Sequence, residues 1–281
     1  MILSGLLALV ASTFPIQTVP AQGGDVTALV RRVAFTIQLA TQEYALGVKD
    51  GKVVLAQEVE EASLFLTEAG KTAGRLPSGS AEVIAGIERV RQLVHATSPA
   101  DSVRAAAVRV IDGLSSRYQI AFDEVPAEAP PLARGASIYQ LQCARCHGGL
   151  GRGDGADGKG LDPLPANLAD AAELADMSPL DFYRRVTVGV AGTAMPSFET
   201  ALSSDDRWAV ALYASTLRLP APSGTIPPAL SAFATTARLS DAQLIAALGD
   251  HANSAQVAAV RAASGLAPDA ARTAATCALL A

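Results

Sequence analysis

The sequence predicts an all-helical protein built from two domains. Apolar residues recur at steps of three and four along residues 25–122, which is the spacing of one face of an α-helix. Half of the 281 residues are hydrophobic but only 5% are aromatic, and alanine is abundant, a composition typical of helices. A proline-rich segment near residue 125 divides the chain in two.

Residues 1–21 have the features of a secretory signal peptide. Ile2 to Val10 form a short apolar run, and Val19-Pro20-Ala21 resembles a cleavage site with small residues. No Lys or Arg precedes the run, so an uncleaved membrane anchor remains an alternative, although the run is shorter than a typical span. We expect an exported protein.

Residues 25–124 predict an up-and-down helical bundle. Asp25 is the expected cap of the first helix, and Asp50-Gly51 marks the turn after it. Four segments present an apolar face, through Val26, Leu29, Val30, Val33, Ile37 and Ala40; Val59, Leu64 and Leu66; Val83, Ile84, Ile87, Val90 and Val94; and Val103, Ala107, Val110 and Leu114.

A linker over residues 125–131, with Pro126, Pro130 and Pro131, leads to the second domain, residues 132–219. This domain contains Cys143-Ala144-Arg145-Cys146-His147, a C-x-x-C-H pentad, which is the attachment signature of haem c. Two thiols at this spacing can form thioethers to one haem, and the adjoining imidazole can bind the iron. The pentad predicts one covalent haem c held by Cys143, Cys146 and His147.

Two other interpretations of the pentad fit the sequence less well. A closed zinc site needs four ligands, and the remaining Cys277, His95 and His251 are isolated in the sequence. A thioredoxin-like redox pair needs a βαβ setting, and no strand pattern precedes Cys143.

Met195 is the predicted sixth ligand of the iron, because a thioether opposite the His is typical of cytochromes c. The chain has two other methionines: Met1 lies in the signal segment, and Met177 precedes a helix start, where Ser178 is the expected N-cap and Pro179 the first helical residue. We interpret Met177 as a hydrophobic staple. Met195 lies in a Gly- and Pro-containing loop that suits a fixed ligand.

The sequence after Met195 predicts further helices. Residues 202–217 form a helix with a broad apolar face that includes Trp208 and Leu212. Residues 220–281 predict a Pro/Ala-rich connector with short helices, one starting at a capping box over Ser240 and Gln243. Cys277, in this connector, has no predicted partner.

Residues 132–217 resemble the class I cytochrome c domain, through Gly135 and Tyr139, the pentad, the glycine-rich loop, the Met-Pro loop and Trp208 with Tyr213. The resemblance implies that Gly135 admits aromatic residues of the last helix, and that a proline carbonyl, of Pro163 or Pro165, accepts a hydrogen bond from the proximal His. It also implies maturation outside the cytoplasm, in bacteria in the periplasm.

A bundle followed by this domain resembles the periplasmic front part of bacterial fusions of a cytochrome c with a high-affinity iron permease. The stretch from Tyr44 to Val54, with the acidic helix after it, carries the likeness. The permease helices and their R-E-x-x-E motif are absent from this sequence, so the chain itself is not expected to transport. The resemblance implies a membrane iron permease as a candidate partner.

Other charged residues have more ordinary interpretations. Glu58, Glu60, Glu61 and Glu68 could bind iron, but a solvated helix face is favoured, as are surface positions for His95 and His251. The Asp residues of the glycine-rich loop, whose G-x-G-x-x-G lacks a preceding strand, suit turns better than a calcium site. Arg152, Arg184 and Arg185 are candidate partners of haem propionates.

The sequence thus predicts a periplasmic monohaem c-type cytochrome that transfers single electrons to or from a redox partner protein, in connection with iron uptake. A haem-containing iron-binding or sensing subunit of a permease assembly is the first alternative, and a haem enzyme with a displaceable sixth ligand is the second. Membrane association would occur through the N-terminal segment or a partner. A formal net charge of −5 argues against nucleic acid as a partner.

Overall fold

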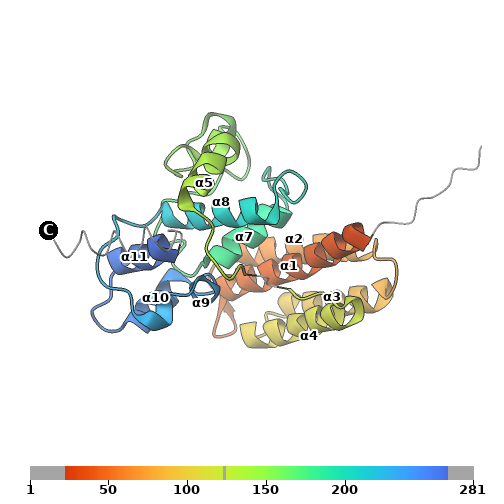
Figure 1. Cartoon of the computed structure of the whole chain (residues 1–281). Helices are drawn as coiled ribbons and strands as arrows, with labels where there is room; N and C mark the ends of the chain where they lie inside the picture. The colour runs from red at the N-terminus through yellow and green to blue at the C-terminus, as the bar shows by residue number, and fades with distance from the viewer. Residues whose placement is uncertain (1–22, 123–124, 265–281) are drawn as a thin grey trace, which may run out of the picture.

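A computed structural model describes residues 23–122 and 125–264 (Figure 1). The prediction of an all-helical chain, with a bundle before a second helical domain, is confirmed. The predicted signal segment 1–21, with Met1, and Cys277 lie outside the described residues. Among the described helices, none combines the length and the apolar character that a membrane span requires.

The first domain is a bundle of α1 (Gly23–Gly47), α2 (Ala56–Ala73), α3 (Ser80–His95) and α4 (Ala100–Tyr118). Between α1 and α2, the short strands β1 (Val48–Lys49) and β2 (Lys52–Val53) form a hairpin. Asp50 and Gly51 both have positive φ there, at 51° and 70°, which is the geometry that an Asp-Gly turn favours.

Most of the predicted apolar positions of the bundle are buried, and Val26, Leu29, Val59 and Val110 are partly buried against its core. Leu64 and Ile84 are exposed, at 41% and 40%. Helix α1 begins at Gly23 and runs through Asp25, so the prediction of Asp25 as its cap was wrong. Between helices, the Tyr44 hydroxyl donates a hydrogen bond to the Ser98 carbonyl at 2.6 Å.

The second domain contains α5 (Leu132–Ile138), a π-helical turn η1 (Tyr139–Cys143), α6 (Ala144–His147), the 3₁₀ turn η2 (Ala156–Gly158), α7 (Pro179–Val188) and α8 (Ser204–Thr216). The predicted capping box of α7 is present, since Ser178 and Asp181 each bond the other's backbone N–H. Trp208 on α8 is 1% exposed and stacks on Tyr183 of α7, with 4.2 Å between ring centroids.

Helices α5 and α8 cross in close contact, as expected from Gly135. A Cβ atom placed at Gly135 would collide with the Ala209 carbonyl and lie 2.8 Å from the Tyr213 Cβ. Beside this crossing, the rings of Tyr139 and Tyr213 lie 5.5 Å apart. The absence of a side chain at Gly135 therefore sets the separation of the two helices.

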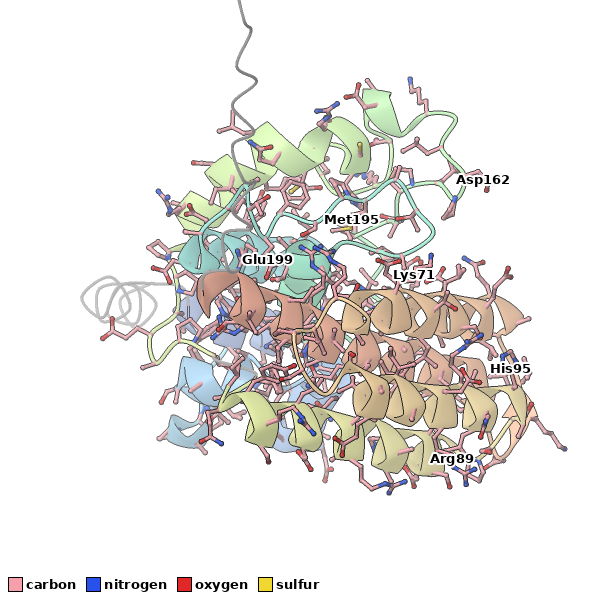
Figure 2. All side chains as sticks on the ribbon, turned by 90° about the vertical axis from the view of Figure 1, so that its right-hand side faces the viewer. Lys71, Arg89, His95, Asp162, Met195 and Glu199 are labelled. Atoms are coloured by element: carbon pink, nitrogen blue, oxygen red, sulfur yellow. The ribbon has the colours of Figure 1, made fainter. Side chains whose placement is uncertain are left out.

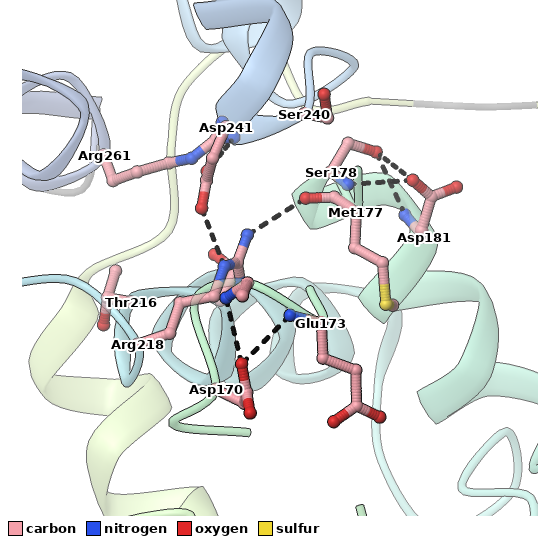
Figure 3. Close-up of polar contacts among 12 residues, drawn as sticks. Asp170, Glu173, Met177, Ser178, Asp181, Thr216, Arg218, Ser240, Asp241 and Arg261 are labelled. Atoms are coloured by element: carbon pink, nitrogen blue, oxygen red, sulfur yellow. Dashed lines mark hydrogen bonds and ion pairs between the residues drawn. The ribbon is translucent and has the colours of Figure 1, made fainter. Parts of the chain in front are cut away.

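The chain after α8 folds against the second domain through η3 (Pro228–Leu230), α9 (Phe233–Thr236), α10 (Asp241–Leu248) and α11 (Ser254–Ser264). The capping box predicted at the start of α10 is present over Ser240 and Gln243. Asp241 accepts hydrogen bonds from two buried arginines, Arg218 at 2.7 Å and Arg261 at 2.9 Å (Figure 3).

The bundle and the second domain share a core. Phe35 of α1 is 3% exposed and belongs to the apolar cluster of the second domain, where it meets Tyr183 edge-on at 6.2 Å between centroids. Val188, Val190 and Ala191 of the second domain pack against the bundle core. The predicted domain limits at residues 124, 131 and 219 remain predictions.

Candidate functional site

The pentad spans the end of η1 and the four-residue helix α6. Cys143 and Cys146 are both half-buried free thiols. Tyr139, at the start of the π-helical turn, is fully buried, and its hydroxyl donates to the Gly148 carbonyl at 2.9 Å. This bond joins the helix before the pentad to the residue directly after it, so the pentad is held at both ends.

Burial raises the pKa of the Cys143 thiol to about 12, with a smaller contribution from Cys146. A thiol with this pKa is protonated at neutral pH, so the folded pocket does not hold Cys143 as a reactive thiolate. This is the opposite of a catalytic or redox-active cysteine, whose pKa is usually lowered.

The His147 ring is oriented by a backbone carbonyl. Its Nδ1 lies 3.0 Å from the carbonyl oxygen of Ala166, which can only accept, so Nδ1 carries the hydrogen and Nε2 is left with a free lone pair. Burial lowers the pKa of His147, against an opposing effect of this bond, so the ring is neutral at neutral pH. A neutral imidazole with one nitrogen fixed by a carbonyl is typical of an iron ligand.

The prediction that Pro163 or Pro165 supplies this carbonyl was wrong by one residue. Ala166 follows Pro165 directly, in a loop that carries a cis peptide bond between Asp162 and Pro163. Two prolines separated by one residue leave the choice of inward-facing carbonyl to the loop's path, which the sequence pattern does not specify.

The glycine-rich loop folds back onto the pentad. Gly153 and Gly155 donate backbone hydrogen bonds to the carbonyls of His147 and Cys146, at 2.8 and 3.1 Å. At Gly158 a Cβ atom would lie 2.7 Å from the Cys146 carbonyl oxygen and 2.6 Å from the Pro165 ring. Glycine is required here because the loop backbone runs against the backbone of α6.

Met195 lies in the loop between α7 and α8 and is partly buried against the aromatic cluster of this domain. Its N–H bonds the Thr193 hydroxyl at 3.1 Å, and its carbonyl accepts from the Val190 N–H at 3.3 Å. Met177 is instead buried in the core before α7, with 7% of its surface exposed. Figure 2 shows Met195 between the pentad-bearing segment and the bundle.

The three arginines proposed as propionate partners differ in their surroundings. Arg184 pairs with Asp181 at 3.3 Å, and Arg185 forms an ion pair with the buried Glu43 of α1. Arg184 is therefore paired within its own helix, and Arg185 is paired across the junction with the bundle. Arg152 is exposed in the glycine-rich loop and remains the candidate of the three.

The structure brings together three carboxylates that the sequence did not group. Glu43 of α1 joins Glu58 and Glu61 of α2, with one ligand oxygen of each within 4.8 Å of the others. Burial, followed by a hydrogen bond and charge repulsion from Glu43, raises the pKa of Glu58 to about 7. Glu60 and Glu68 are exposed, as are His95 and His251. The prediction of a solvated face was therefore wrong for the half-buried Glu58 and Glu61.

Glu43 was missed because sequence reasoning considered only the acidic run of one helix. It is 4% exposed and lies beside the buried Tyr44, three residues after the buried Ala40. A charged residue inside an apolar stripe was the available signal, since an ionised group rarely lies there without a partner. Its partner Arg185 lies 142 residues away in the sequence.

Two family models match the chain. Residues 4–109 match the iron permease-associated 4-helix bundle domain, and residues 130–213 match subunit III of cbb3-type cytochrome c oxidase. The chain therefore carries an iron permease-associated bundle followed by a cytochrome c domain, and the predicted resemblance is confirmed. The second match also supports a haem cofactor.

No curated protein matches the chain. Among solved structures, a chain described as part of the reducing HAO-like protein complex of Kuenenia stuttgartiensis is 31% identical over 41% of this chain, with a TM-score of 0.29. The match spans 60% of the length of that chain.

The side chains of the site fit a haem c. Two thiols lie three residues apart, at the end of η1 and on α6, and the imidazole of the next residue has its Nε2 free. A loop methionine is partly buried on the same domain. The thiols are unpaired, and the donor set of one nitrogen and one thioether is that of an electron-transfer haem.

Proposed function

We propose that this protein is a periplasmic monohaem c-type cytochrome that transfers single electrons in connection with iron uptake. The observation that carries the proposal is the state of His147, a neutral imidazole whose Nδ1 is bound to Ala166 and whose Nε2 is free beside two unpaired thiols. The match of residues 130–213 to a cytochrome c domain supports it.

Each residue of the site has a separate role in this proposal. Cys143 and Cys146 tether the haem through thioethers, His147 and Met195 bind its iron, and the Ala166 carbonyl orients the His147 ring. The haem, when bound, supplies an iron that changes between two oxidation states. Two protein ligands leave no open coordination position, which favours electron transfer over binding of small molecules.

A pair of methionine variants tests the ligands. Met195→Leu and Met177→Leu both replace methionine by a side chain of similar volume, so stability changes little. We expect the ferric wild-type protein and Met177→Leu to show the near-infrared charge-transfer band of a thioether ligand, and Met195→Leu to lack it. Ferrous Met195→Leu should bind carbon monoxide, whereas the other two should not.

Two results would contradict the proposal. Rapid carbon monoxide binding by the ferrous wild-type protein would mean a displaceable sixth ligand, and the haem enzyme would become the favoured function. Release of the pigment into acidified organic solvent would mean that Cys143 and Cys146 form no thioethers.

A membrane iron permease is the partner that we propose, because residues 4–109 match a domain described as iron permease-associated. A periplasmic location follows from the same proposal, since covalent haem attachment occurs outside the cytoplasm. Co-purification of the full-length protein with the permease from membranes would support this partner. Recovery of a soluble redox protein alone would contradict it.

Iron binding by the bundle is the second candidate function. The specific observation in its favour is the group formed by Glu43, Glu58 and Glu61, whose oxygens lie close enough to bind one cation. Carboxylate oxygens are suitable ligands for divalent iron, although the three also suit other hard cations. Iron here would be a substrate delivered to the permease.

Calorimetric titration of the whole holoprotein with ferrous iron, without oxygen, tests this candidate. Glu61→Gln should weaken binding by about tenfold or more, equivalent to about 1.4 kcal/mol. Glu68→Gln, on the exposed face of the same helix, should leave binding unchanged. Affinity should rise with pH through about 7, because the metal displaces the proton of Glu58. Equal, weak binding by all three proteins would exclude the site.

A further inference from the structure

Helix α1 of the bundle contacts the Met195 loop, residues 189–203, at the loop's far end, which follows Met195. The Arg32 Nη2 lies 2.6 Å from the Glu199 carboxylate and 3.3 Å from the Ser197 hydroxyl. Glu199 is largely buried, with 12% of its side chain exposed, and Arg32 has 32%. An ion pair with this degree of burial is less screened than one at the surface.

The contact reaches the backbone of the loop through Ser197. The Ser197 hydroxyl donates to the Thr187 carbonyl of α7 at 2.6 Å and accepts from the Glu199 N–H at 3.3 Å. Arg32 therefore stabilises the turn in which the loop, two residues after Met195, returns to α7.

The near end of the loop also rests on the bundle. Val190 and Ala191 pack against the apolar core of the bundle. A Cβ atom at Gly192 would lie 2.8 Å from a methyl group of Leu64, on α2. Leu64, which is exposed and was predicted as a core residue, thus touches the loop three residues before Met195.

Turn hydrogen bonds, rather than a helix or strand, hold the loop within its own domain. Residues 189–203 contain no helix or strand, and the bonds within the loop nearest Met195 are those to Thr193 and Val190. From its own domain, Arg207 of α8 donates to the carbonyls of Glu199 and Leu202, at 3.1 and 2.7 Å. Contacts that hold an irregular loop decide how much of the time it occupies one conformation.

Apolar packing is incomplete beside Glu199, the partner of Arg32. A cavity of about 390 Å³ lies between α1 and the second domain, lined among others by Phe35, Glu199 and Arg207. Since the interface is open at this point, the polar contacts of Arg32 act together with those of Arg207 to position the loop's far end.

We propose that Arg32 is a positioning residue for the sixth iron ligand: the bundle holds the Met195 loop in the conformation that ligates the haem. The proposal rests on the His147/Met195 ligation proposed above. It makes the bundle a determinant of the haem's reduction potential, because a thioether ligand raises that potential and its loss lowers it.

Three arginine variants of the full-length holoprotein test this role. Arg32→Ala removes both contacts to the loop, and Arg32→Lys retains a cation that can reach Glu199. Arg89→Ala removes an exposed arginine on α3, on the side of the bundle away from Met195 (Figure 2). The measurements are the near-infrared thioether band of the ferric form, the rate of carbon monoxide binding to the ferrous form, and the midpoint potential.

We expect Arg32→Ala to weaken the band, to lower the potential, and to bind carbon monoxide about fivefold faster. Loss of a part-buried ion pair should raise the population of loop conformations without the Met195 ligand by about this factor. Arg32→Lys should restore the band and the potential at least in part, and Arg89→Ala should match the wild type. A merely structural ion pair would lower the unfolding temperature of Arg32→Ala and leave the spectrum and potential of the folded protein unchanged.

A second variant keeps the test decisive if Arg32→Ala does not fold. Leu64→Ala alters an exposed residue and removes the contact with Gly192, so it should shift the same three readouts in the same direction. If Arg32→Ala and Leu64→Ala both fold and keep the wild-type band, carbon monoxide rate and potential, the role of the bundle is overturned. Absence of the thioether band from the wild-type protein would instead overturn the ligation by Met195.

Discussion

Asp241 links the C-terminal helices to the cytochrome domain through two buried arginines. Its carboxylate bonds both Arg218, whose side chain is fully buried, and Arg261, whose side chain is 1% exposed. Burial lowers the pKa of both guanidinium groups, that of Arg261 to about 10, and Asp241 opposes this effect. Figure 3 shows the carboxylate between the two arginines, with Arg218 also donating to the Met177 carbonyl.

Removing this carboxylate should be severely destabilising. Asp241→Ala would leave two buried guanidinium groups without their common anion, and breaking a buried ion pair in this way costs about 3–5 kcal/mol of unfolding free energy. Denaturant unfolding measures the loss. Asp101→Ala, which breaks an exposed pair with Arg104, should cost less than about 1 kcal/mol. Similar losses in the two variants would mean that the buried network contributes no more than a surface pair.

At the scale of single elements, the crossing of α5 and α8 determines where the pentad lies. Gly135 contacts the backbone of α8 at Ala209, and one turn later Tyr139 bonds Gly148. Since α5 continues through η1 into the pentad, a shift of α5 away from α8 would move Cys143 and His147 with it.

A pair of glycine variants separates this packing effect from helix propensity. Gly135→Ala would place a methyl group on the Ala209 carbonyl, so the helices must separate, and overpacking of this kind costs about 1–3 kcal/mol. Gly113→Ala, in α4 with nothing within 4 Å of the added methyl group, should instead stabilise by about 0.5–1 kcal/mol. Thermal unfolding of both variants is the measurement, and an unchanged or raised unfolding temperature for Gly135→Ala would contradict the close crossing.

At the scale of the whole molecule, the bundle and the cytochrome domain are joined by side chains that each domain contributes to the other. Phe35 completes the aromatic cluster of the second domain, and Arg184 lies over its ring at 6.0 Å. On the same helix α1, Glu43 receives Arg185. The acidic group of the bundle is thus connected directly to the helix that precedes the Met195 loop.

This junction should make stability depend on pH through Glu58. Because its pKa is raised to about 7, Glu58 keeps its proton in the folded state at pH values where the unfolded chain has already lost it. The contribution of Glu58 to the free energy of unfolding therefore falls as the pH rises toward about 7. Glu58→Gln cannot ionise. We therefore expect the variant to gain about 1 kcal/mol of unfolding free energy over the wild type between pH 5 and pH 8, after allowance for solvent screening.

Denaturant unfolding in the presence of a chelator measures this difference without interference from metal ions. Glu68→Gln, which alters an exposed carboxylate on the same helix, serves as the control and should show the same difference from the wild type at both pH values. A constant difference for Glu58→Gln as well would mean that Glu58 titrates in its ordinary range.

The features that could be predicted from the sequence are local ones. The helical periodicity, the caps at Ser178 and Ser240 and the turn at Asp50-Gly51 depend on bonds that span three or four residues, so they are visible in the sequence. The C-x-x-C-H spacing is equally local, because its three side chains lie within five consecutive residues at the junction of η1 and α6. The assignment of Met195 as the sixth ligand also rests on local loop composition, and it remains a prediction.

The features that only the tertiary structure decided join distant segments. Arg32 meets Glu199 across 167 residues and Arg185 meets Glu43 across 142, and no periodicity relates such positions. Glu43 joins Glu58 and Glu61 only because α1 and α2 pack side by side, and Ala166 rather than a proline reaches His147 because of the path of its loop. The physical reason is that these contacts follow from how helices and domains pack, which no spacing along the chain encodes.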